Sequence, residues 1–73
     1  MFYVYVLQSL KDCKLYIGYS DDLKRRVQEH NSGKNKSTKH RKPFRLVYYE
    51  AYQSKLDAEN RETNLKLFGR ALG

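Results

Sequence analysis

Arg26 and His30 lie one helical turn apart within the segment LYIGYSDDLKRRVQEH, residues 15–30. At about 100° per residue, they share a helix face with Leu23 and Val27, which is the stripe expected to face the core. A guanidinium and an imidazole are unusual in a core, but together they suit the binding and reaction of a phosphate. The spacing therefore predicts phosphate chemistry on the inner face of this helix.

A carboxylate near the end of the chain is a second candidate. Glu62 lies on a helical stripe of apolar residues, namely Ala58, Leu65 and Leu72. Burying an unpaired carboxylate costs several kcal/mol, so Glu62 needs a partner. Two kinds of partner are open: a structural salt bridge to Arg26 or Lys66, or a divalent cation.

Strands and a helix in the first half of the chain would position Arg26 and its neighbours. Residues 2–8 and 15–19 are rich in β-branched and aromatic side chains in alternation, which predicts two strands. The polar connection between them is short enough for a hairpin, so these strands should be antiparallel neighbours. Residues 21–30 are predicted as a helix that Ser20 caps and that ends at Gly33.

A basic loop and a third strand follow. Residues 34–43 are predicted as a loop because Pro43 forbids a helix through them. Residues 44–52, FRLVYYEAY, are predicted as a strand. Tyr48 and Tyr49 point to opposite faces of this strand, so one of them should pack and the other should be exposed.

The last predicted element is a helix from residue 55 to 68 or beyond, capped by Ser54. Glu59 falls on a different face of this helix from Glu62 and is expected to be exposed. The whole pattern predicts a single α+β domain over residues 1–73: a small three-stranded antiparallel sheet flanked by helices, in the order ββαβα. Because the chain stops in or just after the helix, two alternatives are open: a short helix or a truncated C-terminus.

The composition favours an anionic partner. The net charge is +7, from 15 Lys and Arg against 8 Asp and Glu, and residues 34–45 hold six basic residues and no acid. Such an excess points to a polyanion rather than a small acidic molecule. A membrane partner is disfavoured because no basic helix carries bulky apolar anchors, and no membrane span or signal peptide is predicted. The lone Cys13 has no partner for a disulfide or metal site, which predicts a reducing, cytoplasmic location.

Five positions in a fixed order resemble the GIY-YIG nuclease domain. Residues 4–6 (VYV) and 16–18 (YIG) resemble its paired motif, with the two tyrosines 11 positions apart. Arg26 follows the second tyrosine by ten positions, His30 follows by four more, and Glu62 lies further on. Each piece alone is weak, but the ordered set is specific. The resemblance covers nearly the whole chain, and it is greatest to the short stand-alone bacterial members of the family.

The resemblance implies a fold and an activity. The fold is a small antiparallel sheet of three strands with helices packed around it. The activity is DNA phosphodiester cleavage with one divalent metal ion, Mg²⁺ or Mn²⁺, and no small-molecule cofactor. The relatives include homing endonucleases, some restriction enzymes and a subunit of a DNA excision-repair nuclease. Repair, restriction and mobile-element contexts are therefore all open.

The resemblance also implies a role for each of the five residues. Glu62 would ligate the metal and Arg26 would hold the scissile phosphate. Tyr5 would position or deprotonate the attacking water, and His30 would orient Tyr5 or accept its proton, so the identity of the base is open. Tyr16 would complete a hydrogen-bonded cluster. The alternative for Tyr5 and Tyr16 is aromatic packing across neighbouring strands.

Further residues are predicted to contact DNA. Gly18 would allow close approach of the substrate or a helix, and Tyr19 stands where some relatives carry lysine. The basic segment would follow the backbone phosphates, which gives salt-sensitive binding with low sequence specificity. Its predicted contacts are Lys34, Lys36, Lys39, His40, Arg41, Lys42 and Arg45. His40 is expected as a backbone or phosphate contact rather than a catalyst.

The sequence departs from the family at two places, which leaves alternatives. Val4 replaces the first motif glycine, and the late asparagine of the family has no match before Gly73. If that asparagine is required, a missing tail, a partner chain or another residue must replace it. The prediction is therefore a metal-dependent DNA endonuclease, alone or with a protein partner or as an oligomer. The alternative is a nucleic-acid-binding module without cleavage; a purely structural domain would leave Arg26, His30 and Glu62 unexplained.

Overall fold

The computed structural model describes the backbone of residues 1–72 and the side chains of residues 1–67. It contains three strands, two α-helices and one short 3₁₀ helix. In chain order they are β1 (Phe2–Ser9), β2 (Leu15–Ser20), α1 (Leu23–Ser32), η1 (Lys39–Arg41), β3 (Phe44–Tyr52) and α2 (Lys55–Leu72). The predicted α+β class and ββαβα order are confirmed.

The three strands form one antiparallel sheet in the order β2-β1-β3. The first two strands are joined as the predicted hairpin. β1 is central, and Tyr5 in it stands opposite Gly18 of β2 and Tyr49 of β3. β2 and β3 are therefore the two edge strands of the sheet.

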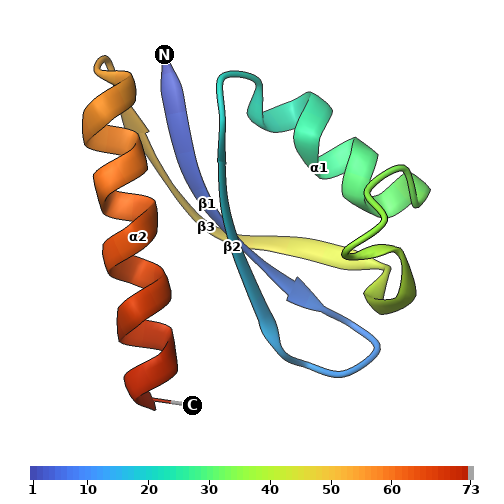
Figure 1. Ribbon diagram of the computed structural model, residues 1–73. Coiled ribbons are helices and arrows are strands. Elements are labelled where there is room, and N and C mark those ends of the chain that lie inside the picture. The colour runs from blue at the N-terminus through green and yellow to red at the C-terminus, as the bar shows by residue number, and fades with distance from the viewer. Residues whose placement is uncertain (73) are drawn as a thin grey trace.

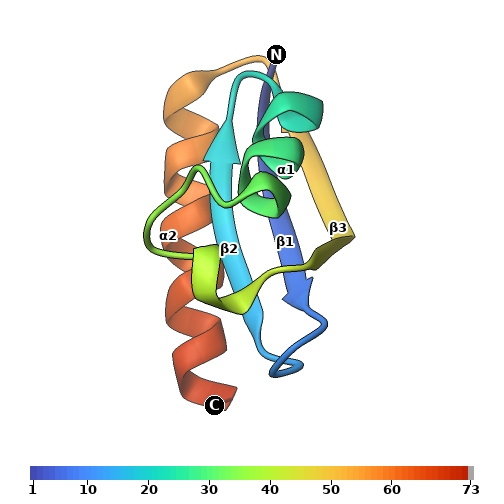
Figure 2. The same ribbon diagram turned by 90° about the vertical axis from the view of Figure 1, so that its right-hand side faces the viewer.

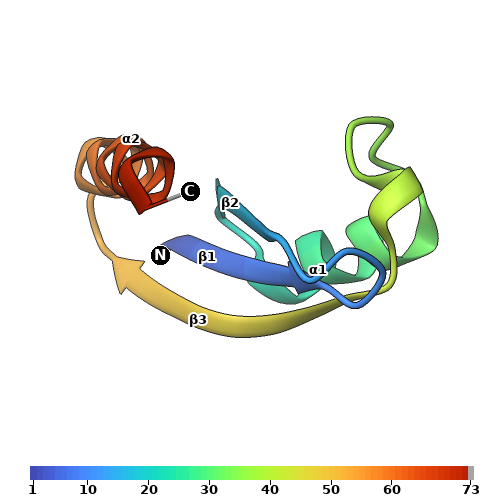
Figure 3. The ribbon, with the colours of Figure 1, turned by 90° about the horizontal axis from the view of Figure 1, so that it is seen from below.

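The two long helices lie on opposite sides of the sheet (Figures 1 and 2). On the α1 side, the buried residues Tyr5, Leu7 and Phe44 form a cluster, against which Leu23 and Val27 of α1 pack. The alternate residues of β1, Val4 and Val6, point to the side that α2 covers, and both are buried. Seen from below, β3 is strongly curved and runs past both helices (Figure 3).

Helix α1 begins later than the sequence predicted. Its N-cap is Asp22, whose carboxylate accepts a hydrogen bond from the Arg25 backbone N–H at 3.1 Å. Ser20 was predicted for this position, but its hydroxyl accepts from the Asp22 N–H at 3.0 Å, inside the turn that precedes the helix. The other end agrees with the sequence, since Gly33 has a φ of 81° and caps the helix in the left-handed conformation.

The basic segment and β3 both differ from expectation. The predicted loop contains η1, which fits before Pro43 because a 3₁₀ turn needs only three residues. Tyr48 and Tyr49 are both exposed, at 47% and 55%, so the prediction that only one of them is exposed is wrong, although the Tyr49 ring lies 6.3 Å from that of Tyr3. β3 is an edge strand, which leaves these side chains more open to solvent than those of the central strand β1.

Helix α2 follows Ser54, whose hydroxyl accepts a hydrogen bond from the Asp57 backbone N–H at 3.3 Å. The predicted cap is therefore confirmed. Ala58 is buried on the sheet side of the helix, as its stripe predicted, whereas the side chain of Leu72 lies outside the described residues. None of the helices in the described chain combines the length and apolar character that a bilayer crossing requires.

Candidate active site

Tyr5 and His30 form a buried hydrogen-bonded pair between β1 and α1. The Tyr5 hydroxyl lies 3.0 Å from Nε2 of His30, and the two side chains are 2% and 0% exposed. On its other side, Nδ1 of His30 lies 2.8 Å from the hydroxyl of Thr38. The ring of Tyr16 packs on the imidazole, with 5.0 Å between centroids. Helix α1 thus delivers His30 to the two motif tyrosines of neighbouring strands.

Gly18 makes this pair sterically feasible. A Cβ at this position would stand 2.5 Å from the Tyr5 hydroxyl oxygen and 2.7 Å from the ring carbon that bears it. The phenol therefore crosses β2 in the space that a side chain would fill. Gly18 was predicted to allow close approach of the substrate or a helix, but in the structure the side chain of Tyr5 occupies this space.

Burial keeps both members of the pair neutral near pH 7. It raises the pKa of Tyr5 well above its usual value, with a further contribution from Tyr16, while Arg26 opposes the shift. Burial also lowers the pKa of His30, and the nearby guanidinium of Arg26 lowers it further. A neutral imidazole has one nitrogen that donates and one that accepts, so it can bridge Tyr5 and Thr38.

Arg26 stands beside this pair with one hydrogen-bonding atom unused. Its Nη1 lies 3.5 Å from Oε1 of Glu29. Its Nε is buried, and no acceptor among the described residues reaches it. A buried donor without a partner costs about 1–3 kcal/mol and calls for an explanation.

Two hollows meet at Arg26, and both carry lysine. One, of about 250 Å³, is lined by Arg26 together with Phe2, Tyr19, Ser20, Asp21 and Lys55. The other, of about 310 Å³, is lined by Arg26 together with Glu29, Lys34, Asn35 and Lys36. An anion in either hollow would meet the guanidinium and at least one lysine.

Glu62 lies on α2, across the sheet from Arg26 on α1. Its carboxylate is 3.3 Å from Nζ of Lys66, so of the two salt bridges considered from the sequence, the one to Lys66 is present. The side chain is 19% exposed. Its charge nevertheless reaches the phenol of Tyr5 and raises its pKa, while the charge of Arg26 lowers it. Arg26 and Glu62 thus act on the same hydroxyl from elements on opposite sides of the sheet.

The donor set fits only one kind of metal site. Within the described residues, no three His, Cys, Asp or Glu side chains gather as a ready ligand cluster. Glu62 offers a single carboxylate, which suits Mg²⁺ because this ion binds through one or two carboxylates and completes its shell with water and substrate phosphate. The residues therefore fit a cation that arrives with its substrate rather than a closed protein cage.

The predicted DNA contacts divide into two groups. Lys34 and Lys36 line a hollow at Arg26, and the exposed residues Lys39, His40 and Lys42 follow in the same segment. Arg41 and Arg45 instead hold the fold together. Arg41 bonds the Asp12 carboxylate at 3.0 Å and lies over the Phe44 ring, and Arg45 donates to the side chain of Gln8.

Tyr19 and Glu59 form a contact that the sequence did not predict. The Tyr19 hydroxyl donates to Oε1 of Glu59 across 3.4 Å, and Lys55 lies 3.8 Å from the same oxygen. Glu59 was expected to be exposed, but it is partly covered by this contact. The contact ties β2 to α2 at the rim of the hollow that Arg26 and Lys55 share.

Two residues near His30, Thr38 and Asn31, make contacts that were not predicted from the sequence. Thr38 is 1% exposed and fixes Nδ1 of the imidazole. Asn31 donates to the Phe44 carbonyl at 3.0 Å and accepts from the Phe44 N–H, which joins the end of α1 to the start of β3. Only their places, next to His30 and within the segment before Pro43, could have pointed to them.

Comparisons with known proteins agree with this geometry. The family model described as the GIY-YIG catalytic domain matches residues 1–71. UPF0213 proteins of Staphylococcus saprophyticus and Staphylococcus haemolyticus are 42% and 45% identical over 69 residues, covering 93% of this chain and 83% of each relative. The solution NMR structure of a UPF0213 protein from Bacillus halodurans matches with 46% identity and a TM-score of 0.55, covering 90% of this chain and 71% of that one. The chain therefore belongs to the GIY-YIG family, alongside the UPF0213 proteins.

Proposed function

We propose that this chain is a DNA endonuclease that hydrolyses phosphodiester bonds with one divalent cation and little sequence specificity. The observation that carries the proposal is the buried Nε of Arg26, which lacks an acceptor at the meeting point of two lysine-lined hollows. A phosphate oxygen would supply that acceptor, and the guanidinium fork matches phosphate geometry. The match to the GIY-YIG family supports the same activity.

The buried pair would move the proton that hydrolysis releases. Thr38 donates weakly to the Asn35 carbonyl, at 3.5 Å, which leaves its oxygen free to accept from Nδ1–H of His30. In that tautomer Nε2 accepts from the Tyr5 hydroxyl. As water attacks the phosphorus, its proton would pass to the Tyr5 oxygen, and the Tyr5 proton would pass to His30. Tyr5 is then the immediate base and His30 the final acceptor.

Glu62 would hold Mg²⁺ or Mn²⁺ with the substrate phosphate and water completing the shell. The bound ion would supply positive charge to the phosphoryl oxygens and the leaving oxygen. The ion would displace the ammonium of Lys66, which lies 3.3 Å from the carboxylate. Exchange of one cation for another lets Glu62 remain paired with or without substrate.

Lys34, Lys36 and Lys55 would hold phosphates on either side of the one at Arg26. These contacts address the DNA backbone and carry no base information. Affinity should therefore fall steeply with salt, by a slope of about 0.9 in the logarithmic plot for each phosphate contact. A domain this small adds little further surface for reading bases, so we expect low sequence specificity.

The test is cleavage of plasmid DNA by the wild type and by Glu62→Gln, with Mg²⁺ or Mn²⁺. Asp57→Asn is the matched control, because it removes the same charge from an exposed site of the same helix. We expect nicking by the wild type and by Asp57→Asn, and loss of nicking by Glu62→Gln with DNA binding retained. Equal nicking by all three proteins would remove Glu62 from the reaction.

A second candidate function is DNA binding without cleavage. It is favoured by the burial of Tyr5 and His30, which are 2% and 0% exposed and so offer little surface to a substrate. It predicts salt-sensitive binding and no nicking at any metal concentration, with Arg26→Gln weakening the binding. The plasmid experiment separates the two functions directly.

A further inference from the structure

The outer edge of β3 is unprotected in the described part of the chain. β3 pairs with β1 on one side only, since the sheet order is β2-β1-β3. Its central residues Leu46, Val47, Tyr48 and Tyr49 are 38%, 43%, 47% and 55% exposed, and none is charged. An edge of this kind offers unpaired backbone N–H and C=O groups beside apolar side chains, a combination that favours pairing with another strand.

A bulge in β3 places the charged residues that flank this run on one face of the sheet. Arg45 and Glu50 are five positions apart, which in a regular strand would put them on opposite faces. The register shifts between Val6 and Leu7 of β1, however, so that Arg45 faces Gln8 and Glu50 faces Val4. Gln8 and Val4 are four positions apart on β1, so their partners share a face, the one that α2 covers.

The same shift brings Leu46 and Tyr49 together on the other face. They stand opposite Leu7 and Tyr5, which are two positions apart on β1 and belong to the α1 side. The strand is therefore symmetric about its centre. At each end of the run a charged residue (Arg45 or Glu50) lies on one face, and the next residue inward, which is apolar (Leu46 or Tyr49), lies on the other face. The two flanking charges are of opposite sign.

We infer that this edge pairs with the same edge of a second copy of the chain, antiparallel and centred between Val47 and Tyr48. In that register Arg45 of each copy faces Glu50 of the other, and Leu46 faces Tyr49. Each facing pair lies on the same side of the combined sheet. A parallel pairing in register would place Arg45 against Arg45, which is unfavourable. The antiparallel pairing instead sets Arg45 beside Glu50, whose carboxylate is bonded by Arg61 of its own chain, so the charges favour the antiparallel arrangement.

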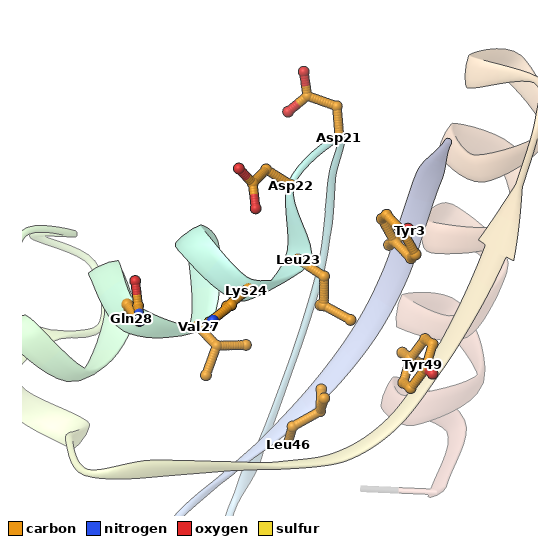
Figure 4. Close-up of a pocket in the computed structure, with 9 residues that line it drawn as sticks. All are labelled: Tyr3, Asp21, Asp22, Leu23, Lys24, Val27, Gln28, Leu46 and Tyr49. Carbon is orange, nitrogen blue, oxygen red and sulfur yellow. The ribbon is translucent and has the colours of Figure 1, made fainter.

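An apolar hollow beside the edge supports this occupant. Its volume is about 590 Å³, and Figure 4 shows Leu46 and Tyr49 of β3 on one side of it and Leu23 and Val27 of α1 on the other. In the inferred pairing the Tyr49 ring of one copy lies against Leu46 of the other, at the mouth of this hollow. Dimerisation would thus cover apolar surface that the monomer leaves open.

The inferred dimer leaves the candidate active site uncovered. β2 forms the opposite edge of the sheet, and the hollow that Arg26 shares with Tyr19 and Lys55 opens beside it. The dimer would be one six-stranded sheet with a β2 strand at each end. The inference therefore stands or falls independently of the nuclease activity.

Charge gives the dimer a distinctive salt response. Two chains of net charge +7 repel each other, and salt screens that repulsion while leaving the apolar contact intact. Dimerisation should strengthen from 0.1 to 0.5 M salt, whereas DNA binding should weaken. The first experiment is sedimentation equilibrium of the wild type at both salt concentrations, up to about 1 mM protein.

Variants then locate the interface. Arg45→Glu would place a carboxylate opposite Glu50 of the other copy, and Tyr49→Lys would place a charge against Leu46. Each substitution should weaken dimerisation at least about tenfold. Leu56→Lys is the control, because Leu56 is 65% exposed on α2, outside the strand that would pair. A wild-type mass of one chain in all conditions would overturn the inference, as would equal weakening by the control. Loss of DNA affinity in Tyr49→Lys with a monomeric wild type would assign the edge to nucleic acid instead.

Crosslinking tests the register. In a Cys13→Ser background, the double variant Leu46→Cys with Tyr49→Cys should form disulfide-linked dimers under mild oxidation, because these positions face each other between copies. The matched control, Leu46→Cys with Tyr48→Cys, puts the two thiols on opposite faces and should crosslink far less. Equal crosslinking of both variants would overturn the proposed register, even if the protein dimerises.

Discussion

Replacing Gly18 with alanine should separate the Tyr5–His30 pair. The new Cβ would lie 2.5 Å from the Tyr5 hydroxyl oxygen, whereas ordinary contact begins near 3.4 Å. The phenol is 2% exposed and has no room to swing aside without moving its neighbours. The hydroxyl must therefore leave its 3.0 Å contact with Nε2 of His30.

The cost of this substitution follows from two effects. Overpacking in a dense core costs about 1–3 kcal/mol, and the loss of a buried hydrogen bond adds about 1 kcal/mol. Against this, alanine is favoured over glycine in a strand by about 0.5–1 kcal/mol. We expect a net loss of about 2 kcal/mol in the free energy of unfolding, measured by urea titration, with a drop of about 4–8 °C in Tm for each kcal/mol.

A double-mutant cycle makes the reasoning refutable. In a Tyr5→Leu background the ring that opposes the Cβ is absent, so Gly18→Ala should become neutral or stabilising through its backbone effect alone. A cost of equal size in both backgrounds would show that the clash with Tyr5 is not its cause. Wild-type stability in Gly18→Ala alone would refute the close approach itself.

Three further predictions concern charge. Burial and Arg26 lower the pKa of His30, so below about pH 6.5 the unfolded chain binds a proton at this residue more readily than the folded chain does. The free energy of unfolding should therefore fall from pH 6.5 towards 5, and His30→Gln should flatten that slope in urea titrations. The pKa of Glu50 is lowered to about 2, chiefly by its bonds from Arg61 and Tyr48. The stabilisation it provides is present above pH 4.5 and lost on acidification through pH 2, so Glu50→Gln should lower Tm at pH 7 but hardly at pH 2. Arg26→Gln should raise the pKa of His30 in an NMR titration, because the guanidinium now holds it down.

The fold was predictable because its signals are local. Alternating aromatic and β-branched residues mark the strands, and a short polar connection fixes the hairpin. Gly33 ends α1 because only a residue at ease with positive φ suits that position, and Ser54 caps α2 with an ordinary side-chain acceptor. The error at the start of α1 is of the same local kind, since Ser20 and Asp22 are both good caps and only the path of the turn selects Asp22.

The site was only partly predictable because its decisive features join distant segments. Periodicity places Arg26 and His30 on the inner face of α1, but it does not reveal that Thr38 supports the imidazole. Similarly, spacing alone did not choose between two partners for Glu62. A salt bridge to Arg26 would depend on the tertiary fold, whereas Lys66, which forms the salt bridge, is one turn away on the same helix. That Tyr5 fills the space over Gly18 also depends on the tertiary fold and not on local sequence.

Because Tyr5 and His30 are neutral at rest, the charge of Arg26 would control whether the proposed proton transfer occurs. If Tyr5 passes its proton to His30, an imidazolium forms beside a guanidinium, and the repulsion between them opposes the transfer. A phosphate bound to Arg26 would cancel that charge and remove the obstacle. The substrate would then activate the relay by binding, and an unoccupied site would stay inactive. If the pKa of His30 is no higher in a DNA-bound complex than in the free protein, this coupling is contradicted. The control is Arg25→Gln, which changes an exposed arginine on the same helix and should leave the pKa of His30 unchanged.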